Sequence, residues 1–149
     1  MRIGGAAIVL LEDDPNDAFF VRHALEQAHI VNPLLAFQTA TDARRDLDHG
    51  PDPMPALFVM DVHLAAGETG IEFLRWLRQQ PAPLGSTPVM MLSGSDNPGD
   101  RDEALSLGSI YFLKKPVTPA TLTTAVQSLG FVITNLTGAT TERTIQRRI

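Results

Sequence analysis

Residues 7–17, AIVLLEDDPND, decide how this chain can fold. An unbroken apolar run, Ala7–Leu11, leads directly into four carboxylates within six residues, from Glu12 to Asp17. A short continuous apolar run is typical of a strand covered on both faces, as in a parallel sheet. Burying an unpaired carboxylate costs several kcal/mol, so the acidic residues need partners or water where the strand ends.

The rest of the chain repeats this pattern of short apolar runs with helical segments between them. Further apolar runs occupy residues 34–37, 56–60, 89–92 and 110–113. Apolar residues three and four apart predict helices within 21–28, 71–77, 104–107 and 122–136, and a weaker one at 41–48. An N-cap residue precedes a proline at Asp14-Pro15, Asn97-Pro98 and Thr118-Pro119, which marks helix starts.

Alternating strands and helices predict an α/β fold with right-handed crossovers. For five strands and five helices we expect a flavodoxin-like, doubly wound parallel sheet in the order 2-1-3-4-5. Ligands of such sheets bind beyond the carboxyl ends of the strands, at the switch point between strands 1 and 3.

Composition excludes several classes of site. The formal net charge of −5 argues against a nucleic-acid-binding surface, and the absence of cysteine excludes disulfides and zinc–thiolate sites. No apolar run approaches the roughly 18 residues of a membrane span, and no signal peptide is recognisable. We therefore expect a cytoplasmic protein that binds neither nucleic acid nor membrane.

Polar residues follow the predicted strands on both sides of the switch point. Glu12 and Asp13 follow the first strand, Asp61 ends the third, Ser93 ends the fourth and Lys115 follows the fifth. Clustered carboxylates suit Mg²⁺, while a lysine and a hydroxyl suit phosphoryl oxygens. A carboxylate in such a site can itself be the nucleophile of phosphoryl transfer.

The remaining two carboxylates of the opening stretch have a simpler interpretation. Asp14 and Asp17 flank Pro15 at a helix start, where a carboxylate caps the helix and complements its dipole. On local grounds we expect replacement of Asp17 by alanine to cost only stability.

The segments IVLLEDDPND, ALFVMDVHL, PVMMLSGSD and YFLKKPV resemble the receiver domain of two-component response regulators over roughly residues 6–129. The resemblance implies that Glu12 and Asp13 form the acidic pair and that Asp61 is the phosphoacceptor. It makes Ser93 the site hydroxyl and Lys115 the site lysine, with Lys114 a surface residue. Mg²⁺ would be held by Glu12, Asp13, Asp61 and the backbone carbonyl of His63.

The resemblance also carries details and departures. Phe112 takes the position of the switch aromatic, and the Lys115-Pro116 bond is expected to be cis. Ala65 stands where the family usually has proline, and the loop to Gly70 is one residue longer than usual. His63 stands where a small polar residue is common, so the dephosphorylation rate is expected to differ.

The implied function is that of a signalling domain, not an enzyme beyond self-phosphorylation and autodephosphorylation. A sensor histidine kinase would be the donor, and the pattern is similar to single-domain receivers paired with phytochrome-type kinases. Phe19, Phe20 and His23 lie partly off the core stripe of the first helix. They fit either kinase docking or ordinary packing and exposure.

The C-terminal region leaves two interpretations open. Apolar spacing predicts an 18-residue final helix over 119–136, whose apolar end would suit a homodimer surface. Alternatively, the helix breaks at Gly130 and the following residues fold back on the domain. We assign residues 1–136 to the receiver and 137–149 to a loose tail without an output domain.

Two other functions compete. A Mg²⁺-dependent phosphatase with an aspartyl nucleophile usually places a second aspartate two residues after the first, where this chain has His63. A phosphorelay intermediate or phosphate sink would use the same residues as a signalling receiver. A degenerate, binding-only receiver is disfavoured because Glu12, Asp13, Asp61, Ser93 and Lys115 are all present.

Overall fold

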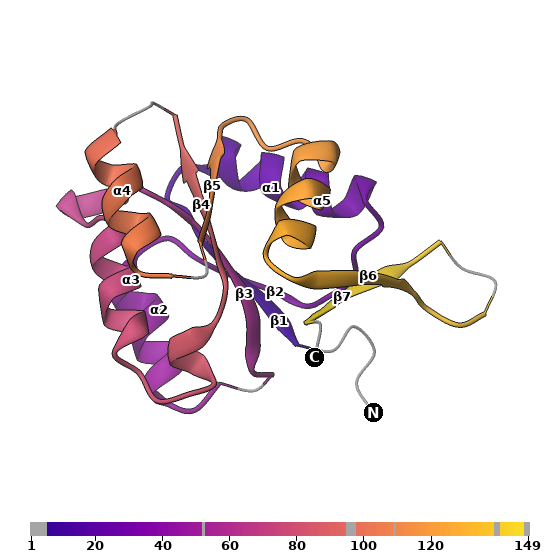
Figure 1. The fold of residues 1–149 in the computed structure, drawn as a ribbon, viewed down its shortest axis with the longest axis horizontal. Coiled ribbons are helices and arrows are strands. Elements are labelled where there is room, and N and C mark those ends of the chain that lie inside the picture. Colours follow the sequence, from indigo (N-terminus) through magenta and orange to yellow (C-terminus); the bar gives the residue numbers. More distant parts are fainter. Residues whose placement is uncertain (1–5, 52, 95–97, 109, 139–140, 148–149) are drawn as a thin grey trace.

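The computed structural model describes residues 6–51, 53–94, 98–108, 110–138 and 141–147. Its main sheet is parallel and has the strand order β2-β1-β3-β4-β5 (Figure 1). These strands are β1 Ala7–Leu11, β2 Leu34–Phe37, β3 Pro55–Asp61, β4 Val89–Ser93 and β5 Ile110–Lys114. The predicted fold class and strand order are confirmed.

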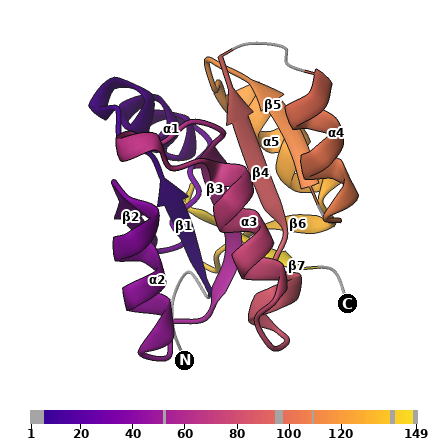
Figure 2. The ribbon, with the colours of Figure 1, turned by 90° about the vertical axis from the view of Figure 1, so that its left-hand side faces the viewer.

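Helices cover both faces of this sheet. Helices α1 and α5 pack on one face, and α2, α3 and α4 on the other (Figures 1 and 2). The helices are α1 Pro15–Gln27, α2 Ala40–Asp48, α3 Gly70–Arg78, α4 Pro98–Ser106 and α5 Pro119–Ser128. Short 3₁₀ turns occupy Ala65–Gly67 and Leu84–Ser86. Within the described residues, no helix is long and apolar enough to span a membrane.

Burial of β1 on both faces explains why its apolar run is continuous. Ile8 and Leu10 belong to the core beneath α1 and α5, whereas Val9 and Leu11 belong to the core beneath α2, α3 and α4. All five residues of β1 are buried. Burying each large aliphatic side chain contributes about 1.5–3 kcal/mol, so the run holds the two layers together.

Two of the three predicted helix starts lie in described residues, and both are confirmed. The side chain of Asp14 accepts a hydrogen bond from the Asn16 N–H at 2.8 Å and caps α1. Thr118 and Thr121 form a reciprocal capping box at the start of α5. Asn97, the third predicted cap, lies outside the described residues.

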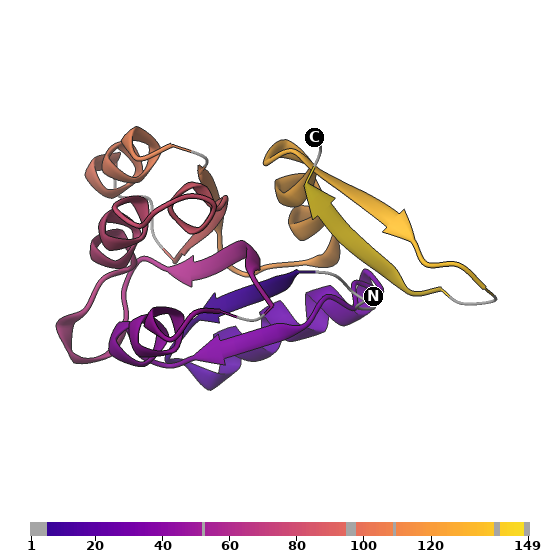
Figure 3. The same ribbon diagram turned by 90° about the horizontal axis from the view of Figure 1, so that it is seen from below.

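Of the two interpretations of the C-terminal region, the 18-residue final helix is wrong, and the break at Gly130 with the chain folding back on the domain is confirmed. Helix α5 ends at Ser128, and Gly130 follows with φ +93°, a left-handed conformation that favours glycine. The chain then forms β6 Phe131–Asn135, which pairs antiparallel with β7 Arg143–Arg147 and extends away from the main sheet (Figure 3). The β-branched residues of FVITN suit a strand better than a helix.

The hairpin of β6 and β7, hereafter the C-terminal hairpin, is fixed to the domain rather than loose. Phe131 and Ile145 are buried in the core beneath α1 and α5. Buried Asn32 accepts a hydrogen bond from the Ile145 N–H at 2.8 Å and donates to the Ile145 carbonyl at 3.2 Å. The Arg143 guanidinium donates to the Ala28 carbonyl at 2.6 Å. The expectations of a loose tail and of an exposed apolar helix end are therefore wrong.

Candidate phosphoacceptor site

The predicted site residues lie at the carboxyl ends of four strands that are consecutive in the sheet. Glu12 directly follows β1, Asp61 ends β3, Ser93 ends β4 and Lys115 follows β5. The Lys115 N–H donates to the Ser93 carbonyl at 2.9 Å, which ties the last two strands together at this edge. Glu12, Asp61 and Ser93 are buried, as expected for groups at the end of a covered sheet.

Lys115 is the centre of the site. Its ammonium forms an ion pair and hydrogen bond with Asp61 Oδ2, donates to Asp17 Oδ2 at 2.6 Å and lies 3.3 Å from Glu12 Oε1. Burial by itself lowers the pKa of Lys115, but the hydrogen bonds to Asp17 and Asp61 outweigh burial and raise that pKa above its usual value. The lysine therefore remains charged and holds three carboxylates together.

Glu12 is the most enclosed acid of the site. Its side chain is 0% exposed, and its Oε2 accepts a hydrogen bond from the Asp14 N–H at 3.2 Å. Desolvation, together with the charge of Asp61, raises the pKa of Glu12 to about 7 despite that hydrogen bond and the charge of Lys115. Among the described residues, Glu12 Oε1 lacks a well-formed hydrogen bond. This leaves it a lone pair for a further partner.

Asp17 differs from the local interpretation. Its carboxylate contacts Lys115 rather than serving only the helix start, whereas the expectation that its replacement costs only stability stays a prediction. Carboxylate oxygens of Glu12, Asp17 and Asp61 lie within 4.8 Å of one another. Asp13, predicted as a metal ligand, is half-buried beside this group but is not one of the three.

The donor chemistry of this group fits a hard divalent cation. Carboxylate oxygens from β1, β3 and α1 converge, and buried Glu12 Oε1 has unused accepting capacity. Mg²⁺ binds through one or two carboxylates together with waters and phosphate oxygens. The site thus offers the type of ligand that such an ion requires, while the assignment of individual ligands stays a prediction.

The backbone around Asp61 is tightly packed. Its Oδ1 accepts a hydrogen bond from the His63 N–H at 3.2 Å. A Cβ atom on Gly70, the first residue of α3, would lie only 2.1 Å from the Asp61 carbonyl oxygen. Only glycine permits this approach of α3 to the end of β3, a requirement that no local sequence pattern predicts.

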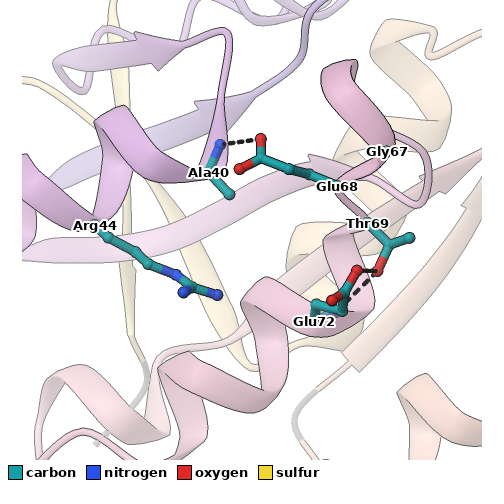
Figure 4. A pocket seen from close by; sticks show the side chains of 6 residues that line it. All are labelled: Ala40, Arg44, Gly67, Glu68, Thr69 and Glu72. Carbon is teal, nitrogen blue, oxygen red and sulfur yellow. Dashed lines mark hydrogen bonds between the residues drawn. The ribbon is translucent and has the colours of Figure 1, made fainter.

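The loop after Asp61 is anchored on α2. Figure 4 shows Glu68 reaching across to Ala40, whose backbone N–H donates to Glu68 Oε1 at 3.0 Å. The Thr41 hydroxyl donates to the other Glu68 oxygen at 3.2 Å. A carboxylate at a helix N-terminus is favourable, so Glu68 fixes the loop that carries exposed His63. Local sequence patterns do not predict the role of Glu68, because its partner Ala40 lies 28 residues away.

The remaining predicted positions are readily located. Phe112 on β5 is half-buried, and the Arg101 guanidinium lies 5.8 Å from its ring centroid. Lys114 is exposed, as expected for the residue before the site lysine. The Lys115-Pro116 bond is cis, as the resemblance implies, and Ala82-Pro83 is also cis, which was not predicted.

Comparison with known proteins decides the family. Residues 8–127 match the family model described as the response regulator receiver domain. The chain belongs to the response regulator receiver family. A relative of this receiver is the KDP operon transcriptional regulatory protein KdpE of Escherichia coli, 33% identical over 73% of this chain and 44% of that protein. The chain spans about half the length of the curated relatives it matches.

Solved structures extend this comparison. The bacteriophytochrome response regulator RtBRR is 26% identical with a TM-score of 0.75, over 93% of this receiver and 83% of that chain. The Mn²⁺-bound form of response regulator Rcp1 is 25% identical with a TM-score of 0.66, over 80% of this receiver and 88% of that chain. Receivers are signalling domains, and the cluster of acidic side chains at Glu12, Asp17 and Asp61 is consistent with membership of this family.

Proposed function

We propose that this receiver accepts a phosphoryl group on Asp61 from a sensor histidine kinase and signals through the conformational or oligomeric change that follows. The observation that carries the proposal is the contact of buried Asp61 with Lys115 at the carboxyl end of β3, beside Glu12. Family membership supports the assignment.

The chemistry follows from the side chains. A carboxylate oxygen of Asp61 attacks phosphorus, a new O–P bond forms, and the P–N bond of the phosphohistidine breaks with its electron pair going to the imidazole. The product is an acyl phosphate on Asp61. Lys115 transfers one of its hydrogen bonds to a phosphoryl oxygen, and the Ser93 hydroxyl donates another.

A bound Mg²⁺ ion would offset the charge that builds up among these carboxylates and phosphoryl oxygens. We assign Glu12, Asp13, Asp61 and the His63 carbonyl to hold it. Support comes from the converging oxygens of the site and from the Mn²⁺-bound form of Rcp1.

The signal leaves through β4, β5 and the helices beside them. Movement of Ser93 toward the phosphoryl group shifts the end of β4, and half-buried Phe112 repacks into the space released. Such a two-state element, biased by a local charge, alters the surface of α4, β5 and α5.

The kinase partner is part of the proposal. Phe19 and Phe20 on α1 are 58% and 44% exposed, and the Phe19 ring stacks on His23 with centroids 5.5 Å apart. Exposed aromatic side chains near a phosphoacceptor favour docking of a kinase helix bundle. Similarity to RtBRR favours a phytochrome-type kinase as the phosphoryl donor. We place this phosphoryl transfer in the cytoplasm.

We also propose that the protein forms a homodimer through the C-terminal hairpin, which takes the place of the expected helix end. Among the described strands, β6 pairs only with β7, which leaves its outer edge for a second chain. Val132 on β6 is 38% exposed and would add apolar contact area.

Phosphorylation by acetyl phosphate with Mg²⁺ tests the proposal. The wild type should gain one acid-labile phosphoryl group by intact mass, and Asp61→Asn should gain none. Asp48→Asn is the matched control, because Asp48 is an exposed aspartate at the far end of α2. Equal labelling of the wild type and Asp61→Asn, or no labelling of the wild type, would overturn the proposal.

A further inference from the structure

Asp17 is held by a contact that its place on α1 does not require. Its carboxylate is 29% exposed and accepts a hydrogen bond from Lys115 Nζ at 2.6 Å, across 98 residues of sequence. The contact joins the first turn of α1 to the segment between β5 and α5.

Helix capping does not account for this arrangement. Asp14 caps α1 through the Asn16 N–H. At the third helical position an acid can reach back to the N-cap N–H, but here the Asp14 N–H donates to Glu12 instead. The carboxylate of Asp17 is thereby left for Lys115.

The geometry at Lys115 limits where its ammonium can point. An ammonium has three N–H donors, and here Asp61, Asp17 and Glu12 surround it. A phosphoryl group on Asp61 would replace the Asp61 oxygen as partner, while Asp17 can keep its own hydrogen bond. A lysine side chain loses considerable rotamer freedom when fixed, so a permanent second partner reduces the loss at phosphorylation.

We propose that Asp17 is a positioning residue, which holds the Lys115 ammonium over Asp61 before and after phosphoryl transfer. This inference rests on the proposed function. It also links the phosphorylated site to α1, the helix that carries the exposed side chains of Phe19 and Phe20.

The test compares Asp17→Asn with Asp14→Asn. Each variant removes one carboxylate charge from the start of α1, and asparagine at position 14 preserves the cap. Of the two variants, only Asp17→Asn removes one of the charged partners of Lys115. We measure the rate of phosphorylation by acetyl phosphate over a range of concentrations, and the lifetime of the acyl phosphate.

Replacing the carboxylate acceptor with a neutral amide weakens the hydrogen bond that positions Lys115, which should slow phosphorylation about tenfold in Asp17→Asn. Asp17→Asn should lower the maximal phosphorylation rate more than it changes the acetyl phosphate concentration that gives half of that rate. Asp14→Asn should match the wild type in both. The ¹H–¹⁵N signal of the Lys115 ammonium should move or broaden in Asp17→Asn alone. A purely structural role would lower the melting temperature without these changes.

The outcomes separate the two claims. A wild type that takes up no phosphoryl group contradicts the proposed function. A wild type that does, with Asp17→Asn equal to Asp14→Asn in rate and ammonium signal, overturns the role of Asp17. Should Asp17→Asn fail to melt cooperatively, Asp17→Ser gives the same comparison with the same two outcomes.

Discussion

At the scale of single residues, Glu12 shows how the fold and the site constrain each other. The side chain directly follows a fully buried strand, so it has little water to stabilise its charge. Its raised pKa, about 7, is the physical result of that position. The metal-free site is therefore stable with Glu12 protonated and less stable when Glu12 ionises.

The sign of the pH dependence follows. In the unfolded chain Glu12 releases its proton near its ordinary pKa of 4.5, whereas in the folded protein it keeps the proton to about pH 7. The folded state thus binds more protons in this window, and stability falls as the pH rises through it. Without divalent cation, we expect up to about 3 kcal/mol of unfolding free energy to be lost between pH 4.5 and 8 through this group.

Urea unfolding at a series of pH values, in chelator, measures this loss. Glu12→Gln should remove the Glu12 contribution and flatten the curve, while Glu26→Gln, an exposed glutamate on α1, should leave it as in the wild type. Parallel curves for the wild type and Glu12→Gln would contradict the account of Glu12.

Residue by residue, the sequence predicts the strand-end groups and misses the long-range partners. Glu12, Asp61, Ser93 and Lys115 are predictable because each ends or follows an apolar run. The role of Asp17 is not predictable from its surroundings, since its partner lies 98 residues away and its position also suits a helix start. Geometry alone reveals that contact.

At the scale of elements, α3 is placed against β3 by the missing side chain of Gly70. The helix begins at Gly70, its N-cap Thr69 accepts from the Glu72 N–H at 3.1 Å, and the Gly70 N–H donates to the Val62 carbonyl at 2.8 Å. Any Cβ there would collide with the backbone carbonyl of Asp61.

Gly70→Ala should therefore lower the free energy of unfolding by about 1 to 3 kcal/mol and move Asp61 enough to slow its phosphorylation. Gly94→Ala is the matched control, because a Cβ on Gly94 meets nothing within 4 Å. We expect the control to change stability by less than about 1 kcal/mol. Thermal and urea unfolding give the answer, and equal stabilities of the two variants would count against the close approach.

The helices and strands are predictable where the apolar spacing agrees with the helix start and stop signals, and not where the two conflict. The five strands of the main sheet follow from apolar runs, and three of the five helix starts follow from a proline at the first helical position. In the C-terminal region, Leu129, Val132, Ile133 and Leu136 continue the helical spacing of α5, so periodicity predicted one long helix. The stop at Gly130 and the β-branched run after it prevail, because β6 can pair with β7 and bury Phe131.

At the scale of the whole molecule, the candidate phosphoacceptor site and the C-terminal hairpin lie in different regions. The site occupies the carboxyl ends of the main strands, whereas β7 is attached near the amino ends through Asn32, which also donates to the Ala6 carbonyl at 3.0 Å. Helices α1 and α5 run between these regions and share one core with the hairpin.

The central claim is that Asp61 itself carries the phosphoryl group. The most direct measurement is reduction of the phosphorylated wild type with borohydride, which converts a phosphoaspartate to homoserine, followed by peptide mapping by mass spectrometry. The account predicts homoserine at position 61 and unchanged aspartates at positions 13 and 17. Homoserine at either of those positions, or none at position 61 in a phosphorylated sample, would contradict it.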